Sequence, residues 1–193
     1  MTLPEKLEKY HIILASNSPR RKQYLADLNL SFEVKPSNVD ESYAPSLKGV
    51  EIASYIAEQK ATFFVELKTN DLIITCDTIV WVDGVALGKP ENEQEAFEML
   101  KKLSNKSHEV ISAVSLKSVH KQETFYDITE VVFKELSDSE INYYIKKYQP
   151  FDKAGSYGIQ EWIGLIGIEK IKGSYTNVVG MPMEKLYKHL MQW

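Results

Sequence analysis

The sequence predicts a mixed α/β fold in which helices cover both faces of an elongated sheet. Segments with helical spacing of apolar residues alternate along the chain with short apolar or alternating runs that are typical of strands. An Asp83-Gly84 pair near the middle marks a hairpin. Strands joined both by helices and by hairpins build a mixed sheet, and we expect two lobes around a central cleft.

Size and composition fit one unit of this kind. The chain has 193 residues, of which 44% are hydrophobic and 26% charged, which is ordinary for a globular protein. We therefore expect a single domain over residues 1–193. The net charge of −4 and the lack of a basic stripe argue against a nucleic-acid partner. One cysteine, no membrane-length apolar run and no signal-peptide core lead us to expect a cytoplasmic protein with no membrane partner.

A strand, a tight loop and a helix open the chain. An apolar run over 12–15 breaks at small polar residues, and a helix is expected over 19–29 with Ser18 as its N-cap. The loop places hydroxyls, free N–H groups, Arg20 and Arg21 at a helix N-terminus, which is an arrangement that binds phosphate. An ordinary N-cap with two solvated arginines explains the same residues, and both interpretations stay open.

The remaining elements follow from the same patterns, taken in chain order. In the first part we expect a strand over 31–35, a loop over 36–49 and a helix over 50–68. In the middle we expect a buried strand over 72–76 that continues extended over 79–82, a return strand over 85–87, a helix over 92–103 and strands over 108–117 and 124–134. In the last part we expect a helix opened by the capping box at 137–140 and stopped by Pro150, a loop over 152–160, a strand over 162–171, a loop over 173–182 and a last helix from Pro182 to about residue 192.

Asp77 is the most informative single residue. It directly follows the buried run 72–76, so its carboxylate is expected at the edge of the sheet, where ligands of α/β proteins collect. There it can bind a hard cation or take a proton from water. Backbone N–H groups often satisfy such an aspartate, but the cationic loop and Lys89 favour a functional role. Lys89 itself, between Gly88 and Pro90, is either aimed at a ligand or a solvated hairpin lysine.

Other polar residues are weaker candidates by themselves. Lys60 in a helix and Glu41 in a long loop are better explained as solvated groups. Gln160 offers both a donor and an acceptor, which suits the edge of a base. Glycines in the segments 152–160 and 173–180 permit close backbone approach to a ligand, although tight turns also explain them. Phosphate-binding GxxxxGK[ST] and GxGxxG motifs, zinc-ligand spacing and a GxSxG elbow are absent.

Six blocks of sequence together resemble the Maf family of nucleoside triphosphate pyrophosphatases, over about residues 11–190. They are Leu14-Ala-Ser-Asn-Ser-Pro-Arg-Arg21, Cys76-Asp-Thr-Ile-Val80, Gly88-Lys-Pro90, Ser107-His-Glu-Val110, Asp152-Lys-Ala-Gly-Ser-Tyr-Gly-Ile-Gln160 and Gly173-Ser-Tyr-Thr-Asn-Val-Val-Gly180. The resemblance implies an enzyme that hydrolyses a nucleoside triphosphate to the monophosphate and pyrophosphate with a divalent cation, Mg²⁺ or Mn²⁺. It also implies a two-lobed fold like that of the inosine triphosphatases, and a homodimer is frequent in the family.

The same resemblance assigns roles to individual residues. Asp77 falls on the proton acceptor, and Asp77 with Glu41 would hold the metal. Base choice is linked to Arg20, Thr78 and Gln160, and this trio resembles the subgroup that acts on dTTP and UTP. The resemblance turns Glu41 and Lys60 into site residues. The substrate-binding positions are completed by Ser16, Arg21, Lys60 and Lys89.

Small departures leave alternatives open. Asn17 and Cys76 stand where the family usually has smaller residues, and Glu161 stands where glycine is common, next to the base-linked Gln160. The alternatives are a pyrophosphatase for 7-methylguanosine triphosphate and a non-catalytic nucleotide-binding regulator of cell division.

Overall fold

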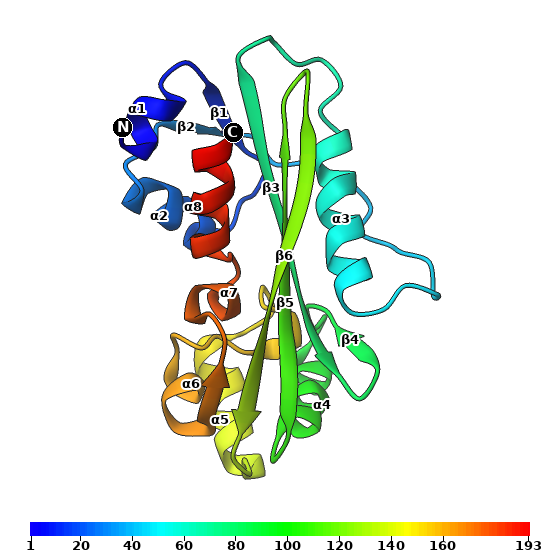
Figure 1. Cartoon of the computed structure of the whole chain (residues 1–193). Coiled ribbons are helices and arrows are strands. Elements are labelled where there is room, and N and C mark those ends of the chain that lie inside the picture. Colours follow the sequence, from blue (N-terminus) through cyan, green and yellow to red (C-terminus); the bar gives the residue numbers. More distant parts are fainter.

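A seven-stranded mixed sheet forms the spine of the molecule in the computed structural model, which describes residues 1–193 (Figure 1). The strands are β1 (His11–Leu14), β2 (Phe32–Val34), β3 (Asp71–Val82), β4 (Val85–Leu87), β5 (Ser107–Lys117), β6 (Gln122–Phe133) and β7 (Ile168–Lys172). The helices are α1 (Leu3–Leu7), α2 (Pro19–Asp27), α3 (Val50–Thr62), α4 (Glu93–Leu103), α5 (Asp138–Tyr148), α6 (Trp162–Gly167), α7 (Tyr175–Val179) and α8 (Met183–Gln192), with a 3₁₀ turn at Ala154–Ser156.

The sheet is mixed, as the sequence predicts. Its strand order is β2-β1-β3-β5-β6-β7, and β4 pairs with β3 on the side where β1 also lies. β1 runs parallel to β2 and β3, and all other pairs are antiparallel. β3, β5 and β6 are long enough to run through the whole molecule, which makes it elongated (Figure 1).

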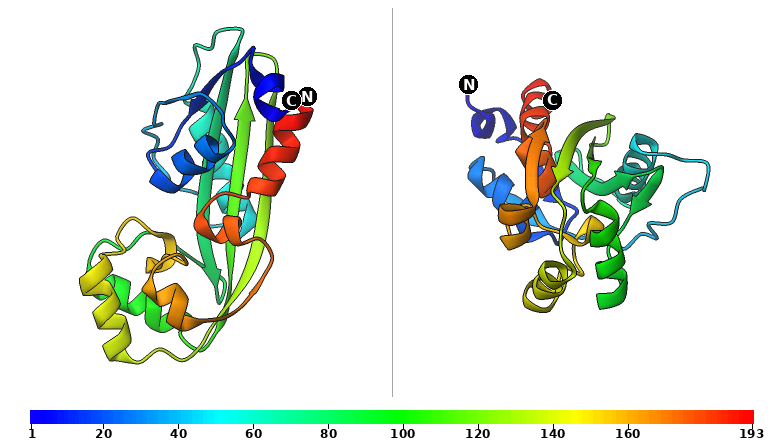
Figure 2. Two further views of the ribbon diagram at one scale, coloured as in Figure 1. Left: turned by 90° about the vertical axis from the view of Figure 1, so that its left-hand side faces the viewer. Right: turned by 90° about the horizontal axis from the view of Figure 1, so that it is seen from below.

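Two lobes share these long strands, and each lobe has its own hydrophobic core. Leu72, Ile74 and Cys76 of β3 belong to the core beneath α1, α2 and α8. Val80 and Val82 of the same strand belong to the core beneath α4, α5 and α6. Figure 2 shows the two lobes one above the other, with α3 on the opposite face of the sheet and both chain termini together beside α1 and α8.

One edge of β3 is left without a neighbour at the boundary between the lobes. β1 pairs with β3 only as far as Ile74, and β4 begins to pair with it only at Val80. Five residues of β3, 75–79, therefore face no strand on that side. An open strand edge offers unpaired N–H and C=O groups, which other parts of the chain or a ligand must satisfy.

Local sequence signals explain most element boundaries. Ser18 accepts from the N–H of Arg21 as the N-cap of α2, and the capping box of Ser137 with Glu140 opens α5. Asp83 and Gly84 both have positive φ, as a two-residue hairpin turn requires.

Several expectations are wrong in detail. Asp77 does not follow a strand but lies in the middle of β3, because β3 continues past the point where β1 stops. The helix expected over 50–68 ends at Thr62, and the chain turns to bury Phe64 against Ile13 and Ile73.

Two segments after residue 160 also differ from the expectation. The strand expected over 162–171 is the helix α6 followed by β7, because a continuous apolar run does not distinguish the two by periodicity. Gly164 permits this turn, since a Cβ there would lie 2.0 Å from the carbonyl oxygen of Ile159. The loop expected over 173–182 contains the short helix α7, capped by Ser174.

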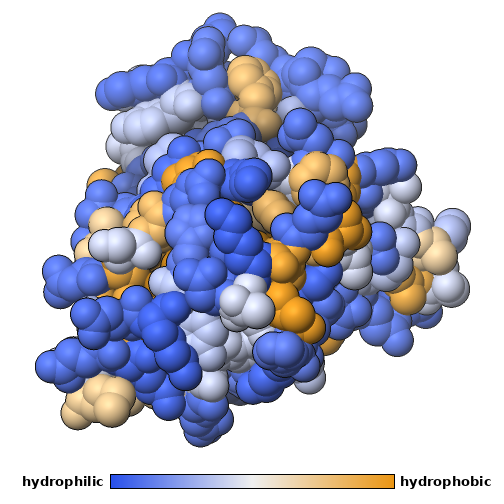
Figure 3. Space-filling view, turned by 90° about the horizontal axis from the view of Figure 1, so that it is seen from above, coloured by the Kyte–Doolittle hydropathy of each residue, from blue (hydrophilic) through white to orange (hydrophobic).

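The surface at the end of the molecule seen in Figure 3 is mostly hydrophilic, with apolar residues in separate small groups. None of the helices has the length and apolar character needed to cross a membrane.

Candidate active site

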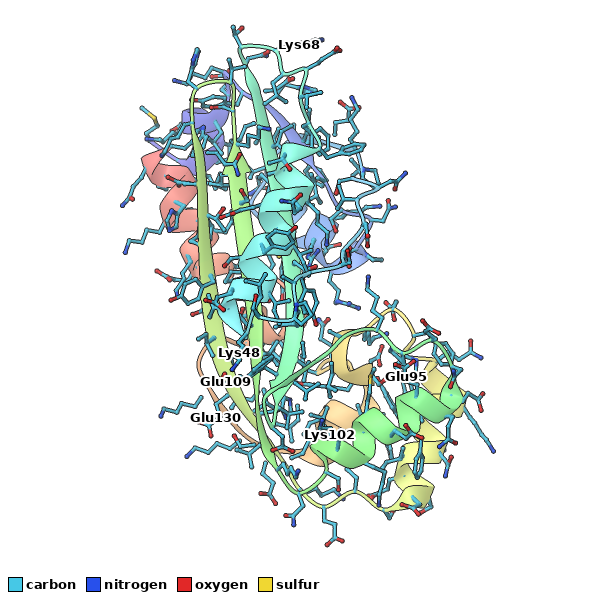
Figure 4. The ribbon with its side chains drawn as sticks, turned by 90° about the vertical axis from the view of Figure 1, so that its right-hand side faces the viewer. Lys48, Lys68, Glu95, Lys102, Glu109 and Glu130 are labelled. Carbon is cyan, nitrogen blue, oxygen red and sulfur yellow. The ribbon has the colours of Figure 1, made fainter.

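A cavity of about 720 Å³ opens at the unpaired edge of β3, between the two lobes. Its walls come from the N-terminus of α2, the loop before α3, α3 itself, β3, the segment after β4 and the segment 152–161. In Figure 4, Lys68 marks the far end of one lobe and Glu95 and Lys102 mark α4 in the other. Every candidate residue of the sequence analysis lines this one cavity: Ser16, Arg20, Arg21, Glu41, Lys60, Asp77, Thr78, Lys89 and Gln160.

Lys60 joins the two candidate carboxylates. It projects from the last turn of α3, and its Nζ lies 2.7 Å from Oδ1 of Asp77 and 2.8 Å from Oε1 of Glu41. Asp77 reaches Lys60 because its side chain points to the face of β3 that α3 covers, the face to which Thr75 and Ile79 also belong. Oδ2 of Asp77 makes no hydrogen bond within the protein, so one carboxylate oxygen remains free toward the cavity.

In the trio of Lys60, Asp77 and Glu41, neighbouring charges outweigh the effect of burial on the pKa values of Lys60 and Glu41. Burial lowers the pKa of Lys60, but the carboxylates of Asp77 and Glu41 outweigh that effect and the net pKa is raised. Burial raises the pKa of Glu41, yet Lys60, Lys89 and Arg21 together bring its pKa below the usual value. Lys60 is therefore an ammonium and Glu41 a carboxylate at neutral pH.

Arg21 closes the open edge of β3. Its guanidinium donates to the carbonyl of Cys76 at 2.7 Å, to the carbonyl of Gly180 at 3.0 Å, and to the hydroxyls of Thr78 and Ser16 at 3.1 and 3.3 Å. Four of its five N–H donors are thus used within the protein. Arg21 mainly fixes the edge of the cavity and has one donor left for a ligand.

Arg20, Lys89 and Gln160 keep more of their hydrogen-bonding capacity. Arg20 donates from Nε to the carbonyl of Val179, and its Nη1 lies 3.6 Å from the carboxylate of Asp152. Lys89 is exposed and forms no ion pair. Gln160 is exposed, and its amide forms no hydrogen bond within the protein. These three groups are the most available to a ligand.

A buried polar relay behind Thr78 escapes the sequence analysis. Oγ of Ser112 donates to the carbonyl of Asn177 at 3.1 Å, and the hydroxyl of Thr78 lies 2.9 Å from Oγ of Ser112 and 3.3 Å from the carbonyl oxygen of Gly180. Thr78 in turn accepts from Arg21, which can only donate. The hydroxyl of Thr78 is therefore surrounded by three polar groups of the protein, from Arg21, Ser112 and Gly180. The available signal was Ser112 itself, a polar residue between Val110 and Val114 on an apolar strand face.

The donor set fits a hard divalent cation in part. Glu41 and Asp77 supply carboxylate oxygens on either side of one ammonium, and Mg²⁺ binds nucleotide sites through one or two carboxylates plus substrate phosphates. No group of three or more His, Cys, Asp or Glu side chains is arranged so that it could hold a metal ion. The protein therefore has no complete metal site made of its own side chains. A metal that also binds the phosphates of a triphosphate has suitable ligands in Glu41 and Asp77.

Similar proteins are known over nearly the whole length of the chain. A chain from Flavobacterium johnsoniae named "dTTP/UTP pyrophosphatase" is 53% identical over 189 residues, covering 97% of each chain. One of the same name from Phocaeicola vulgatus is 56% identical over 188 residues, covering 96% of this chain and 97% of that one. Among solved structures, a HAM1 protein from Coxiella burnetii shares the fold with a TM-score of 0.52 at 14% identity, covering 95% of this chain and all of that one. The profile of the family described as "Maf-like protein" matches residues 11–193, and this chain therefore belongs to the Maf-like family.

Proposed function

We propose that this chain is a nucleoside triphosphate pyrophosphatase that hydrolyses dTTP and UTP to the monophosphate and pyrophosphate. The observation that carries the proposal is the trio of Asp77, Lys60 and Glu41 at an open strand edge, in a cavity that also exposes Lys89 and Arg20. A chain of net charge −4 needs such a local group of cations to bind a triphosphate. The name "dTTP/UTP pyrophosphatase", carried by relatives that are about half identical over nearly their whole length, supports the same activity.

The reaction uses Asp77 as the proton acceptor. Lys60 holds Oδ1 of Asp77, and the free Oδ2 takes a proton from a water molecule as its oxygen attacks the α-phosphorus. The bond from the α-phosphorus to the bridging oxygen breaks, and pyrophosphate leaves with that oxygen. Lys60, Lys89 and Arg20 offset the negative charge on the phosphates, because positioning and charge do most of the catalysis in reactions at phosphorus.

A divalent cation, Mg²⁺ or Mn²⁺, would be held by Asp77 and Glu41 together with phosphate oxygens, where it supplies charge for the departing pyrophosphate.

Base choice is assigned to Arg20, Thr78 and Gln160. Thr78 shares its hydroxyl among Arg21, Ser112 and Gly180, so it supports base choice by holding the cavity wall at Arg21 and Gly180 in place. The free amide of Gln160 supplies a donor and an acceptor on the other side of the cavity. The preference for thymine and uracil is supported by the name "dTTP/UTP pyrophosphatase" of the similar chains.

A substrate panel tests the proposal. Purified protein is incubated with dTTP, UTP, CTP, GTP and 7-methylguanosine triphosphate, each with Mg²⁺ or Mn²⁺, and pyrophosphate release is measured. We expect dTTP and UTP to give the highest kcat/KM. A higher kcat/KM for 7-methylguanosine triphosphate would contradict the substrate assignment. Binding of dTTP without release of pyrophosphate under either metal would contradict the enzymatic proposal and favour a nucleotide-binding regulator.

A further inference from the structure

A second group of charges lies in the wall of the cavity, away from Asp77. Nζ of Lys153 lies 2.7 Å from Oδ1 of Asp152 and 3.1 Å from Oε1 of Glu161, and the Lys153 side chain is only 9% exposed. A lysine buried this deeply is stable as an ammonium only with such partners. The two carboxylates therefore tie together the two ends of the segment 152–161.

Tyr144 of α5 anchors this segment to the helices behind it. Its phenol is fully buried, accepts from the N–H of Gly158 at 3.0 Å and donates its single proton to Oε2 of Glu161. Burial and the neighbouring Glu161 raise the pKa of Tyr144, so the phenol stays a donor over the whole working range of pH. One carboxylate oxygen of Glu161 thus pairs with Lys153, and the other accepts a hydrogen bond from Tyr144.

The packing around Gly158 shows that this arrangement is tight. A Cβ at Gly158 would lie 2.9 Å from Cδ of Glu161 and 3.0 Å from Cε of Lys153. The backbone of the segment therefore approaches the Lys153–Glu161 pair as closely as a glycine allows. Gln160 precedes Glu161 directly, and its free amide faces the cavity.

The same charges reach across to the other lobe. Oδ2 of Asp152 lies 3.6 Å from Nη1 of Arg20, which projects from α2 into the same cavity. Burial raises the pKa of Asp152, but Lys153 and Arg20 lower it by more, and the net pKa lies below the usual value. This carboxylate is therefore ionised at neutral pH. Four side chains of alternating charge therefore form a row that ends at the phenol of Tyr144. They are Arg20, Asp152, Lys153 and Glu161.

We propose that Glu161 and Tyr144 are positioning residues for base recognition, which hold the amide of Gln160 at the angle needed to read the base. This inference rests on the proposed function, because it assigns Gln160 to the base. Neither residue forms a hydrogen bond or ion pair with Asp77, Lys60 or Glu41. Loss of either contact frees the backbone at Gln160 and weakens discrimination between bases, while Asp77 and Lys60 keep their geometry.

The test compares UTP with CTP, which share the sugar and triphosphate and differ only in the base. The variants are Glu161→Gln, which keeps an acceptor for Tyr144 but loses the charge facing Lys153, and Tyr144→Phe, which removes only the hydroxyl. Matched controls are Glu135→Gln and Tyr148→Phe. Glu135 is exposed and makes no side-chain hydrogen bond, and Tyr148 stacks on Tyr144 but its hydroxyl has no partner.

We expect the UTP-to-CTP ratio of kcat/KM to fall about tenfold in both variants, the loss typical of one misaligned hydrogen bond. The loss should come from a higher KM for UTP, with kcat for UTP changed by less than about twofold. The controls should leave the ratio unchanged. The double variant should be no worse than either single one, because both changes break the same anchor.

Two outcomes would overturn the proposal. One is an unchanged UTP-to-CTP ratio of kcat/KM in a folded Glu161→Gln protein, whether both values stay the same or fall in parallel, as a merely structural role predicts. The other is an unchanged ratio of the Kd values of UMP and CMP, measured by calorimetry without turnover. If Tyr144→Phe fails to fold, Glu161→Gln alone decides. A wild-type protein that binds UMP in preference to CMP but hydrolyses neither triphosphate contradicts the proposed function and leaves the binding comparison to judge the positioning role.

Discussion

Lys60 donates to Asp77 across 2.7 Å, from helix α3 to strand β3, and each of these side chains is only 10% exposed. The contact fixes one oxygen of the carboxylate and leaves the other free. The proposed reaction needs this orientation of Asp77, and Lys60 of helix α3 holds it.

Asp77→Asn should lower kcat by about 10²- to 10⁴-fold, the usual contribution of a general base. The amide can still accept from Lys60 and Glu41 still pairs with that ammonium, so the protein should fold, with a lower free energy of unfolding because one buried charge partner is lost. Asp83→Asn is the matched control, because Asp83 belongs to the hairpin at the end of the same strand and asparagine tolerates its positive φ. Pyrophosphate release and thermal unfolding are measured for both. Near-normal turnover in Asp77→Asn would remove Asp77 from this role.

Arg21→Lys should destabilise the protein although the charge is kept. A lysine has no planar fork and cannot serve the four acceptors that Arg21 joins. We expect a loss of about 2–4 kcal/mol in the free energy of unfolding, since hydrogen bonds from a charged donor to partly buried groups are lost. Arg20→Lys should cost less than about 1 kcal/mol, because Arg20 makes one such bond. Urea unfolding compares the two, and equal losses would refute the role of Arg21 as the closure of the sheet edge.

His108 should make the protein less stable in mild acid. Burial lowers the pKa of His108 from 6.5 to about 4. Between these pH values the unfolded chain binds more protons than the folded protein does. The stability that depends on a neutral His108 is therefore complete above pH 6.5 and is lost as the pH falls toward 4. The shift corresponds to about 3 kcal/mol.

The matched variant for this prediction is His108→Gln, which does not titrate and can still hydrogen-bond to the hydroxyl of Tyr157. Unfolding free energies are measured from pH 4 to pH 7 for both proteins, and their difference isolates His108 from the carboxylates. Parallel curves would show that His108 is protonated equally in both states.

Gly155→Ala should lower the free energy of unfolding by about 2–4 kcal/mol, from overpacking together with a backbone that L-residues rarely adopt. Gly155 has φ of +67°, and an added Cβ would lie 2.8 Å from Cγ2 of Val80. Gly88→Ala is the control, because nothing lies within 4 Å of a Cβ there, although its carbonyl accepts from Gly155. Chemical unfolding should leave Gly88→Ala within about 1 kcal/mol of the wild type. A larger loss for Gly88→Ala than for Gly155→Ala would contradict this explanation.

Local signals in the sequence were sufficient for much of the fold. The caps at Ser18 and Ser137 and the turn at Asp83-Gly84 each satisfy nearby backbone groups, so a few neighbouring residues determine them. The candidate residues for the cavity were also found, because blocks of the sequence resemble a known family, and the structure brings them to one cavity.

Features that depend on distant parts of the chain could not be predicted in this way. The middle position of Asp77 in β3 results from β1 ending early, which nothing near Asp77 encodes. The contact of Glu161 with Tyr144 and the relay from Thr78 to Asn177 join separate elements. Helix α6 forms where a strand was expected, because Ile163 packs into the core beneath α4, α5 and α6, which is built from distant residues.

The continuous strands limit how the enzyme can open and close. A clam-shell swing of one half against the other would bend β3 and β5 together across an unbroken antiparallel ladder. We expect gating to fall instead to the loop before α3, which carries Glu41, and to the segment 152–161, which carries Gln160. Amide hydrogen exchange during turnover should then quicken in those two stretches and stay slow along the β3–β5 ladder.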